Sequence, residues 1–275
     1  MDALLPTEIA ERAEALGAEK TRYPFLKLLT LAVLAGAFIA LGAMFSTTVM
    51  AGASDAAPFG LVRLAGGLAF ALGLVLVVLG GAELFTGNNL MVMAWVAGKI
   101  GLKEMLRAWI IVYVGNAIGA VGTALLVFLA EQYRLDGGSA GVLALEFAEA
   151  KAGLAPLTAF MRGVLCNVLV CLAVWLAIGA RGAADRVLVL LLPIAAFVAA
   201  GFEHSVANMY IIPLGQLILA GAPNAFWQET GLSLDGFAAI GWSGLVANLI
   251  PVTAGNIVGG GILVGAVYWF VYRRD

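Results

Sequence analysis

The residues that could do chemistry gather in two short polar segments inside long apolar stretches. Segment 81–89 reads Gly-Ala-Glu-Leu-Phe-Thr-Gly-Asn-Asn, and segment 201–208 reads Gly-Phe-Glu-His-Ser-Val-Ala-Asn. His204 is the only histidine of the chain, and an imidazole can gain or lose a proton near neutral pH. Because an ionisable group at membrane depth is costly, we interpret His204 as functional. The alternative is a neutral imidazole that only hydrogen-bonds the backbone around it.

Three other side chains in these segments have open roles. Thr86 could donate a hydrogen bond to an anion or cap the helix that follows, and both roles can hold. Glu203 is interpreted first as structural, because its carboxylate could accept the unpaired N–H groups of its own loop. Glu83 occupies a similar place in the first segment. This similarity favours a structural role for both carboxylates.

Basic and apolar residues near the two segments suggest a path for charge. Lys151 precedes the fourth apolar stretch, where it either attracts anions by its field or is a solvated lysine at the membrane surface. Arg162 lies deeper, so its guanidinium needs a partner, at a subunit interface or in an outer vestibule. Phe70, Leu74 and Phe197 lie a few turns before the polar segments. Such apolar collars can gate a pore by dewetting, although packing alone would also explain them.

The elements that must position these residues are membrane-spanning helices. The chain of 275 residues is 63% hydrophobic and 12% charged, whereas a soluble domain is about half apolar and a quarter charged. Stretches such as 28–44 and 187–201 are nearly free of polar side chains. The alternating pattern of a membrane barrel is absent, so an all-α bundle is predicted.

The same composition argues against several other classes of protein. No run of basic residues suggests binding to nucleic acid. Cys166 and Cys171 share one apolar stretch, so we interpret them as packing residues and not as part of a metal site. We therefore expect no cofactor, no metal and no enzyme activity.

The chain divides into two predicted parts. Residues 1–22 form an amphipathic cytoplasmic helix that lies on the membrane surface or against neighbouring subunits. This segment is charged, so we expect no cleavable signal peptide. Residues 23–275 form the transmembrane domain, whose spans are about 23–50, 61 onward with a break at 83–89, about 103–130, about 154–178, 185 onward with a break at 201–205, and about 241–272.

The two halves of this domain form a predicted inverted repeat. Spans one to three and four to six run in opposite directions, and the middle span of each half is broken. With the termini in the cytoplasm, 11 of the 15 basic residues fall on the cytoplasmic side, as the positive-inside rule requires. Broken helices at matching positions of two halves point to a transport site. Half-helix N-termini that converge there favour anions and disfavour cations.

Four strings in these spans resemble the formate/nitrite transporter family over nearly the whole chain. They are Glu83-Leu84-Phe85-Thr86-Gly87-Asn88, Leu165-Cys166-Asn167 with Leu169–Ala173, Gly201-Phe202-Glu203-His204 with Ala207-Asn208-Met209, and Asn248–Thr253 with Gly255-Asn256. The resemblance implies an aquaporin-like six-helix protomer that assembles as a homopentamer, with one pore in each protomer.

The resemblance also implies roles for single residues. His204 would be the central pore histidine, Thr86 the threonine of the first break, and Lys151 the lysine of the outer vestibule. Asn167 and Asn256 would lie near the pore, and Glu203 beside the histidine. The two hydrophobic constrictions would comprise Phe70, Leu74, Leu84, Phe85 and Phe197.

We therefore expect a channel for small monovalent anions in a bacterial inner membrane, in contact with lipid. Formate is the favoured substrate, because the sixth span is similar to the formate branch of the family. Nitrite or hydrosulfide is the alternative, because the fourth span is closer to nitrite-type members and Arg162 departs from the formate pattern. A water or neutral-solute channel is more remote, since the paired Asn-Pro-Ala signature is absent. A purely structural protein would not explain two matched breaks.

Overall fold

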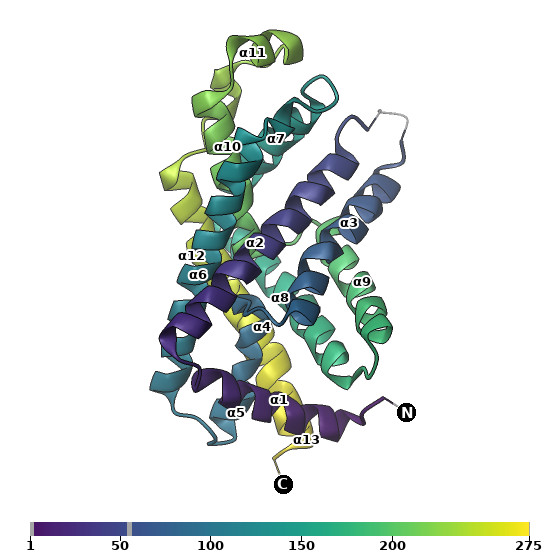
Figure 1. The fold of residues 1–275 in the computed structure, drawn as a ribbon, viewed down its shortest axis with the longest axis vertical. Helices are drawn as coiled ribbons and strands as arrows, with labels where there is room; N and C mark the ends of the chain where they lie inside the picture. The colour runs from purple at the N-terminus through teal and green to yellow at the C-terminus, as the bar shows by residue number, and fades with distance from the viewer. Residues whose placement is uncertain (1–2, 54–56, 275) are drawn as a thin grey trace.

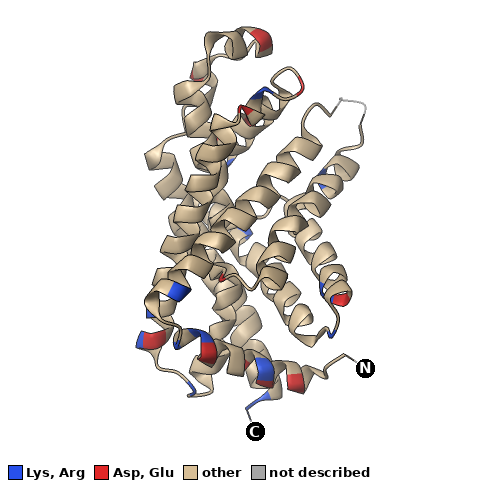
Figure 2. Ribbon diagram, viewed as in Figure 1, with Lys and Arg blue, Asp and Glu red and all other residues tan. Residues whose placement is uncertain are grey.

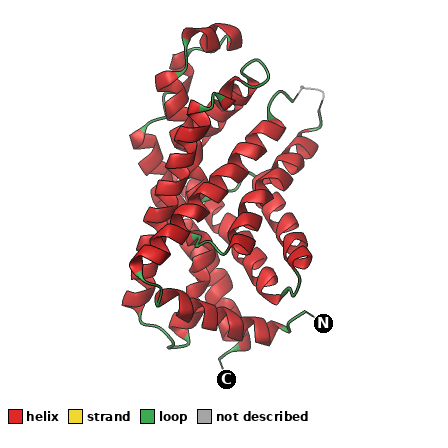
Figure 3. Cartoon of the chain, viewed as in Figure 1, coloured by secondary structure: helices red, strands yellow, loops and turns green. Residues whose placement is uncertain are grey.

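A computed structural model describes residues 3–53 and 57–274 of the chain. Every regular element in that part is a helix (Figure 3), as predicted. In lipid a helix satisfies its own backbone N–H and C=O groups, which is why long apolar stretches adopt it. Five helices of the described part are long and apolar enough to cross a membrane. The fifth predicted span is instead divided between two helices of 17 residues each.

The helices follow the predicted spans to within a few residues. In the first half they are α2 (Phe25–Met50), α3 (Phe59–Gly80), α4 (Phe85–Asn88), α5 (Val92–Val96) and α6 (Leu102–Leu129). In the second half they are α8 (Pro156–Gly179), α9 (Ala183–Ala199), α10 (Ser205–Gly221) and α12 (Trp242–Ile257), and α12 continues through the π-helical segment Val258–Ala266 into α13 (Val267–Tyr272).

The two breaks lie at the same place in the two halves. Each begins at a glycine in the left-handed region, Gly81 with φ 70° and Gly201 with φ 71°, a conformation that costs glycine little. In Figure 1, α3 and α9 enter the middle of the molecule from opposite ends. α2 packs against α3 and α6 just as α8 packs against α9 and α12. The predicted inverted repeat is confirmed.

The structure contains helices that the sequence analysis missed. α7 (Ser139–Ala152) and α11 (Asn224–Thr230) lie in stretches that connect the predicted spans. Their apolar residues are too few for a span, so hydropathy alone does not reveal them. α7 packs against α10 and carries Lys151. It therefore places this lysine against the second break.

The N-terminal helix α1 (Pro6–Thr21) lies across one end of the molecule, beside both termini (Figure 1). Its apolar face, with Ile9, Ala10 and Ala13, is buried against α5 and α8 of the same chain. Figure 2 shows charged residues gathered on α1 and at the two ends of the molecule, with few in between. Residues 1, 2, 54–56 and 275 of the two predicted parts lie outside the described residues.

Candidate functional site

The backbone of each break is held by an asparagine from the last span of its half. In the second half, Asn256 accepts a hydrogen bond from the Ser205 amide at 3.0 Å and donates one to the Glu203 carbonyl at 3.0 Å. It also donates to the carbonyl of Gly163 at 2.8 Å. These bonds satisfy groups that a broken helix leaves unpaired. The structure thus gives Asn256 a bracing position, and its predicted place at the pore stays a prediction.

Asn116 makes the same contacts in the first half. It accepts from the Phe85 amide at 2.9 Å and donates to the carbonyls of Glu83 and Ala32 at 2.9 and 2.7 Å. This residue was not among the predicted site residues. A Gly-Asn pair recurs in the third and sixth spans, at Gly115-Asn116 and at positions 255–256, and this repeat is the signal that could have found it.

The Glu203 carboxylate forms a buried ion pair. Its Oε1 lies 2.8 Å from Nζ of Lys151, and its Oε2 accepts from Asn208 at 2.6 Å. The side chains of Lys151 and Glu203 are 18% and 2% exposed, so Lys151 is not a solvated lysine at the surface. The expectation that this carboxylate accepts N–H groups of its own loop was wrong. The Glu203 amide donates instead to the Arg162 carbonyl at 3.2 Å, which leaves the carboxylate to Lys151.

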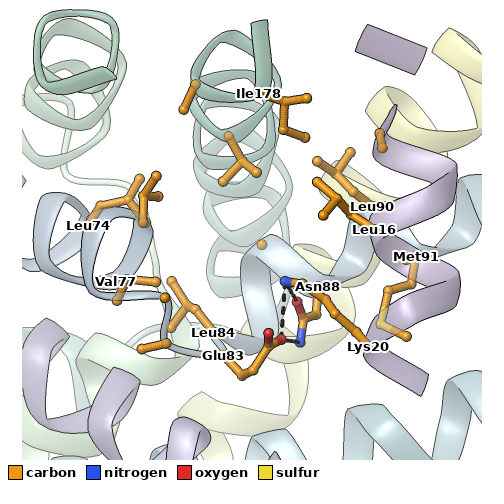
Figure 4. A pocket seen from close by; sticks show the side chains of 18 of the residues that line it. Leu16, Lys20, Leu74, Val77, Glu83, Leu84, Asn88, Leu90, Met91 and Ile178 are labelled. Atoms are coloured by element: carbon orange, nitrogen blue, oxygen red, sulfur yellow. Dashed lines mark hydrogen bonds and ion pairs between the residues drawn. The ribbon is translucent and has the colours of Figure 1, made fainter. Parts of the chain in front are cut away.

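Glu83 repeats this arrangement in the first break. Its carboxylate lies 3.1 Å from Nζ of Lys20 on α1 and accepts from Asn88 at 2.8 Å (Figure 4). Its amide donates to the carbonyl of Leu31 at 3.1 Å, so the same correction applies. In both breaks the asparagine follows the glutamate by five residues. Each break therefore carries one lysine–glutamate–asparagine cluster.

The two breaks meet through His204 and Thr86. Nε2 of His204 lies 3.0 Å from Oγ1 of Thr86, and its Nδ1 accepts a hydrogen bond from the Ala207 amide at 3.1 Å. The His204 side chain thus caps the N-terminus of α10. The N-terminus of α4 has no side-chain cap, so Thr86 does not cap the helix that follows the first break. Because Nδ1 accepts, the proton of the neutral ring is on Nε2 and points to Thr86. The Thr86 hydroxyl is then free to donate to a third group.

Asn167 joins the two halves behind this pair. Its Nδ2 donates to the Thr86 carbonyl at 3.2 Å, to the Asn256 carbonyl at 2.7 Å and to Oδ1 of Asn89 at 2.8 Å. The thiol of Cys171 donates to the same Thr86 carbonyl at 3.3 Å. Asn167 is fully buried, and its hydrogen bond to the Thr86 carbonyl holds the backbone of Thr86 in place.

One cavity borders each break. The larger, of about 330 Å³, opens on the side of the termini and is lined by Leu74, Leu84 and neighbours (Figure 4). The smaller, of about 70 Å³, lies on the other side and is lined by His204, Phe70 and Phe197, with Arg63 and Lys151. The Phe197 ring lies 5.4 Å from that of Phe70 and stacks 5.9 Å from that of His204, between centroids. Four of the five predicted constriction residues therefore face one of these cavities.

Two predicted residues lie elsewhere. The Phe85 ring packs edge-on against Tyr113 and Trp109, with centroids 4.9 and 5.9 Å away, and it lines neither of the two cavities above. Its role in a constriction stays a prediction. The Arg162 side chain is exposed on α8, with no partner among the described residues. A neighbouring subunit as its partner also stays a prediction.

Comparison with known proteins gives one consistent result. Residues 7–270 match the formate/nitrite transporter family. The formate channel FocA of Escherichia coli K12 is 41% identical over 276 residues, covering 100% of this chain and 96% of the relative. A probable formate transporter of Methanothermobacter thermautotrophicus is 37% identical over 285 residues, covering 98% of this chain and 97% of the relative.

Solved structures agree with these sequence relatives. A pentameric formate channel with formate bound is 44% identical, has a TM-score of 0.86, and matches over 90% of this chain and 97% of its own. An ion channel of the same family is 29% identical, has a TM-score of 0.83, and matches over 96% of this chain and 99% of its own. The chain belongs to the formate/nitrite transporter family.

Proposed function

We propose that the chain is a channel for small monovalent anions, with formate as its main substrate, and that it conducts through each protomer of a homopentamer. The relatives named as formate channels and the pentameric relative with formate bound support this proposal. We place it in a bacterial inner membrane with both termini in the cytoplasm, since the end of the molecule that holds the termini carries most basic residues.

The observation that carries the proposal is the contact of His204 with Thr86, which joins the two breaks, because the first break borders the larger cavity and the second break borders the smaller one. Apolar side chains line each cavity, and arginines lie in both linings, Arg12 and Arg186 in the larger and Arg63 in the smaller. An anion drawn in by these charges meets an apolar passage, where a bare charge is costly. The hydrogen-bond donors of the pair are the groups that can reduce this cost.

In our mechanism His204 lowers the charge of the passing anion. Toward a passing anion, the neutral ring and the Thr86 hydroxyl can offer hydrogen bonds but no proton. A protonated ring can in addition give its proton to formate, so that neutral formic acid crosses the apolar collar. Protonation requires Nδ1 to release the Ala207 amide, since a charged imidazole has no acceptor atom. Proton transfer is thus coupled to the cap of α10.

Ion flux in proteoliposomes tests the proposal. We expect formate flux to exceed chloride flux and to rise at acid pH, and we expect His204→Asn to remove the pH dependence. Nitrite flux well above formate would reassign the substrate within the family, and no anion flux would refute the channel. The same pH dependence in wild type and His204→Asn would exclude proton transfer at His204.

A further inference from the structure

The larger cavity contains more positive charge than its carboxylate can neutralise. Arg12 and Lys20 of α1 line it together with Arg186 of α9, and Glu83 is the acidic residue among the described lining. Arg12 and Lys20 are eight residues apart, so both lie on the face of the helix that borders the cavity. Glu83 already pairs with Lys20 at 3.1 Å. The positive charges of the two arginines are therefore not neutralised by a carboxylate of the cavity lining.

Neither arginine has a partner in the described part of the chain. The Arg12 side chain makes no hydrogen bond or ion pair to another described residue. The Arg186 side chain makes none either, and its Nε is buried without a hydrogen-bond partner. Buried donors are normally satisfied by protein or ordered water. Both arginines line the larger cavity, so two guanidinium groups from two helices border one cavity without a partner in the described part of the chain.

The size of the cavity and the chemistry of its donors suggest what fills it. At about 330 Å³ the space is much larger than a formate ion needs, and it falls within the range of sites for small organic ligands. A guanidinium binds carboxylate or phosphate through two parallel hydrogen bonds. Two such groups match a ligand with two negative charges.

We propose that this cavity binds a small organic dianion, either a phosphate monoester or a short dicarboxylate, and that the bound dianion inhibits transport. The ligand would bridge Arg12 on α1 and Arg186 on α9. It would then occupy the larger cavity next to Leu74 and Leu84, on the path that a smaller anion takes. The inhibitory part of this inference rests on the proposed function, whereas binding does not.

Calorimetry on the detergent-solubilised protein tests binding without any assumption about transport. The probes are glycerol 3-phosphate and succinate, with acetate as the monovalent control at constant ionic strength. The variants are Arg12→Gln, Arg186→Gln and their combination. Arg107→Gln on α6 is the matched control, because it removes the same charge from an exposed residue outside the cavity lining.

We expect one or both dianions to bind more tightly than acetate, and the double variant to weaken that binding about tenfold or more. The two dianion arms distinguish a phosphate site from a dicarboxylate site. The single variants decide the result if the double variant does not fold. Equal binding by wild type and variants would overturn the site. So would an equal loss in Arg107→Gln or no binding of either dianion.

Formate flux in proteoliposomes with and without the tighter dianion then tests inhibition. We expect the dianion to reduce flux through wild type but not through the arginine variants. Dianion binding that leaves flux through wild type unchanged would refute inhibition alone. If wild type conducts no anion, the channel proposal fails, and calorimetry still decides whether the dianion site exists.

Discussion

At the scale of single residues, the backbone of each break depends on one buried asparagine for its hydrogen bonds. Asn116 is fully buried and holds three backbone groups of the first break and α2. Asn116→Ala would leave these groups without partners. We expect this change to lower the free energy of unfolding by about 2 to 4 kcal/mol, because an unsatisfied buried group costs about 1 to 3 kcal/mol. Thermal unfolding in detergent would measure it.

The control is Asn224→Ala at the exposed start of α11, which we expect to change the unfolding temperature little. The pseudo-symmetric variant Asn256→Ala should behave like Asn116→Ala, because the contacts correspond one by one. If Asn116→Ala unfolded at the same temperature as wild type, the bracing role of the asparagines would be wrong.

The Lys151–Glu203 pair gives a second prediction at this scale. Lys151→Met would leave the Glu203 carboxylate, 2% exposed, with neutral partners only. We expect a loss of about 3 kcal/mol in the free energy of unfolding, since breaking a buried pair leaves an uncompensated charge. The double variant Lys151→Met/Glu203→Gln should recover much of this loss. A double variant whose losses simply add would show that the two groups do not interact.

At the scale of elements, the backbones of α2 and α6 approach each other closely at glycine residues. A Cβ on Gly119 would overlap the carbonyl oxygen of Val33, whereas a Cβ on Gly122, one turn further along α6, meets nothing within 4 Å. We expect Gly119→Ala to lower the free energy of unfolding by about 3 kcal/mol, because backbone cannot make way as a side chain can. Gly122→Ala should have no effect or stabilise slightly. Equal unfolding temperatures for the two variants would contradict this.

The sequence predicts the spans well because burial in lipid has a simple signal, a long apolar stretch. It also predicts the two breaks, since glycine and charged residues interrupt that signal at residues 81–89 and 201–208. The position of α7 was not predictable in this way, because its 14 residues are neither long nor apolar enough to span. Yet α7 supplies Lys151 to the site. Short helices packed on the spans are set by tertiary contacts, which hydropathy does not report.

The residues of the site were predictable by type but not by partner. His204 and Thr86 stand out as polar groups in apolar surroundings, and they are hydrogen-bonded. The bracing role of Asn116 depends on its contact with residues more than 30 positions away. Likewise, pairing Glu83 with Lys20 of α1 requires the packing of the N-terminal helix. Such pairs follow from the arrangement of helices and not from local sequence.

At the scale of the whole molecule, one buried carboxylate joins three distant parts of the chain. Glu14 of α1 is 1% exposed and lies 2.5 Å from Nζ of Lys99, after α5, and 3.1 Å from Nε of Arg273, after α13. These two ion pairs, together called the Glu14 clasp, fix α1 to the end of the bundle. There α1 forms one wall of the larger cavity. The contacts of the Glu14 side chain therefore affect the shape of the larger cavity.

Glu14→Gln would leave two cations facing each other across a neutral amide. We expect faster hydrogen exchange of the α1 amides, with little change in α2 and α6, because the clasp holds α1 and not the spans. The control is Glu11→Gln, an exposed residue of the same helix. Unchanged exchange in α1 would show that its apolar face alone holds it. Because Arg12 and Lys20 move with α1, Glu14→Gln should also weaken dianion binding in the larger cavity, although neither arginine of that site is altered.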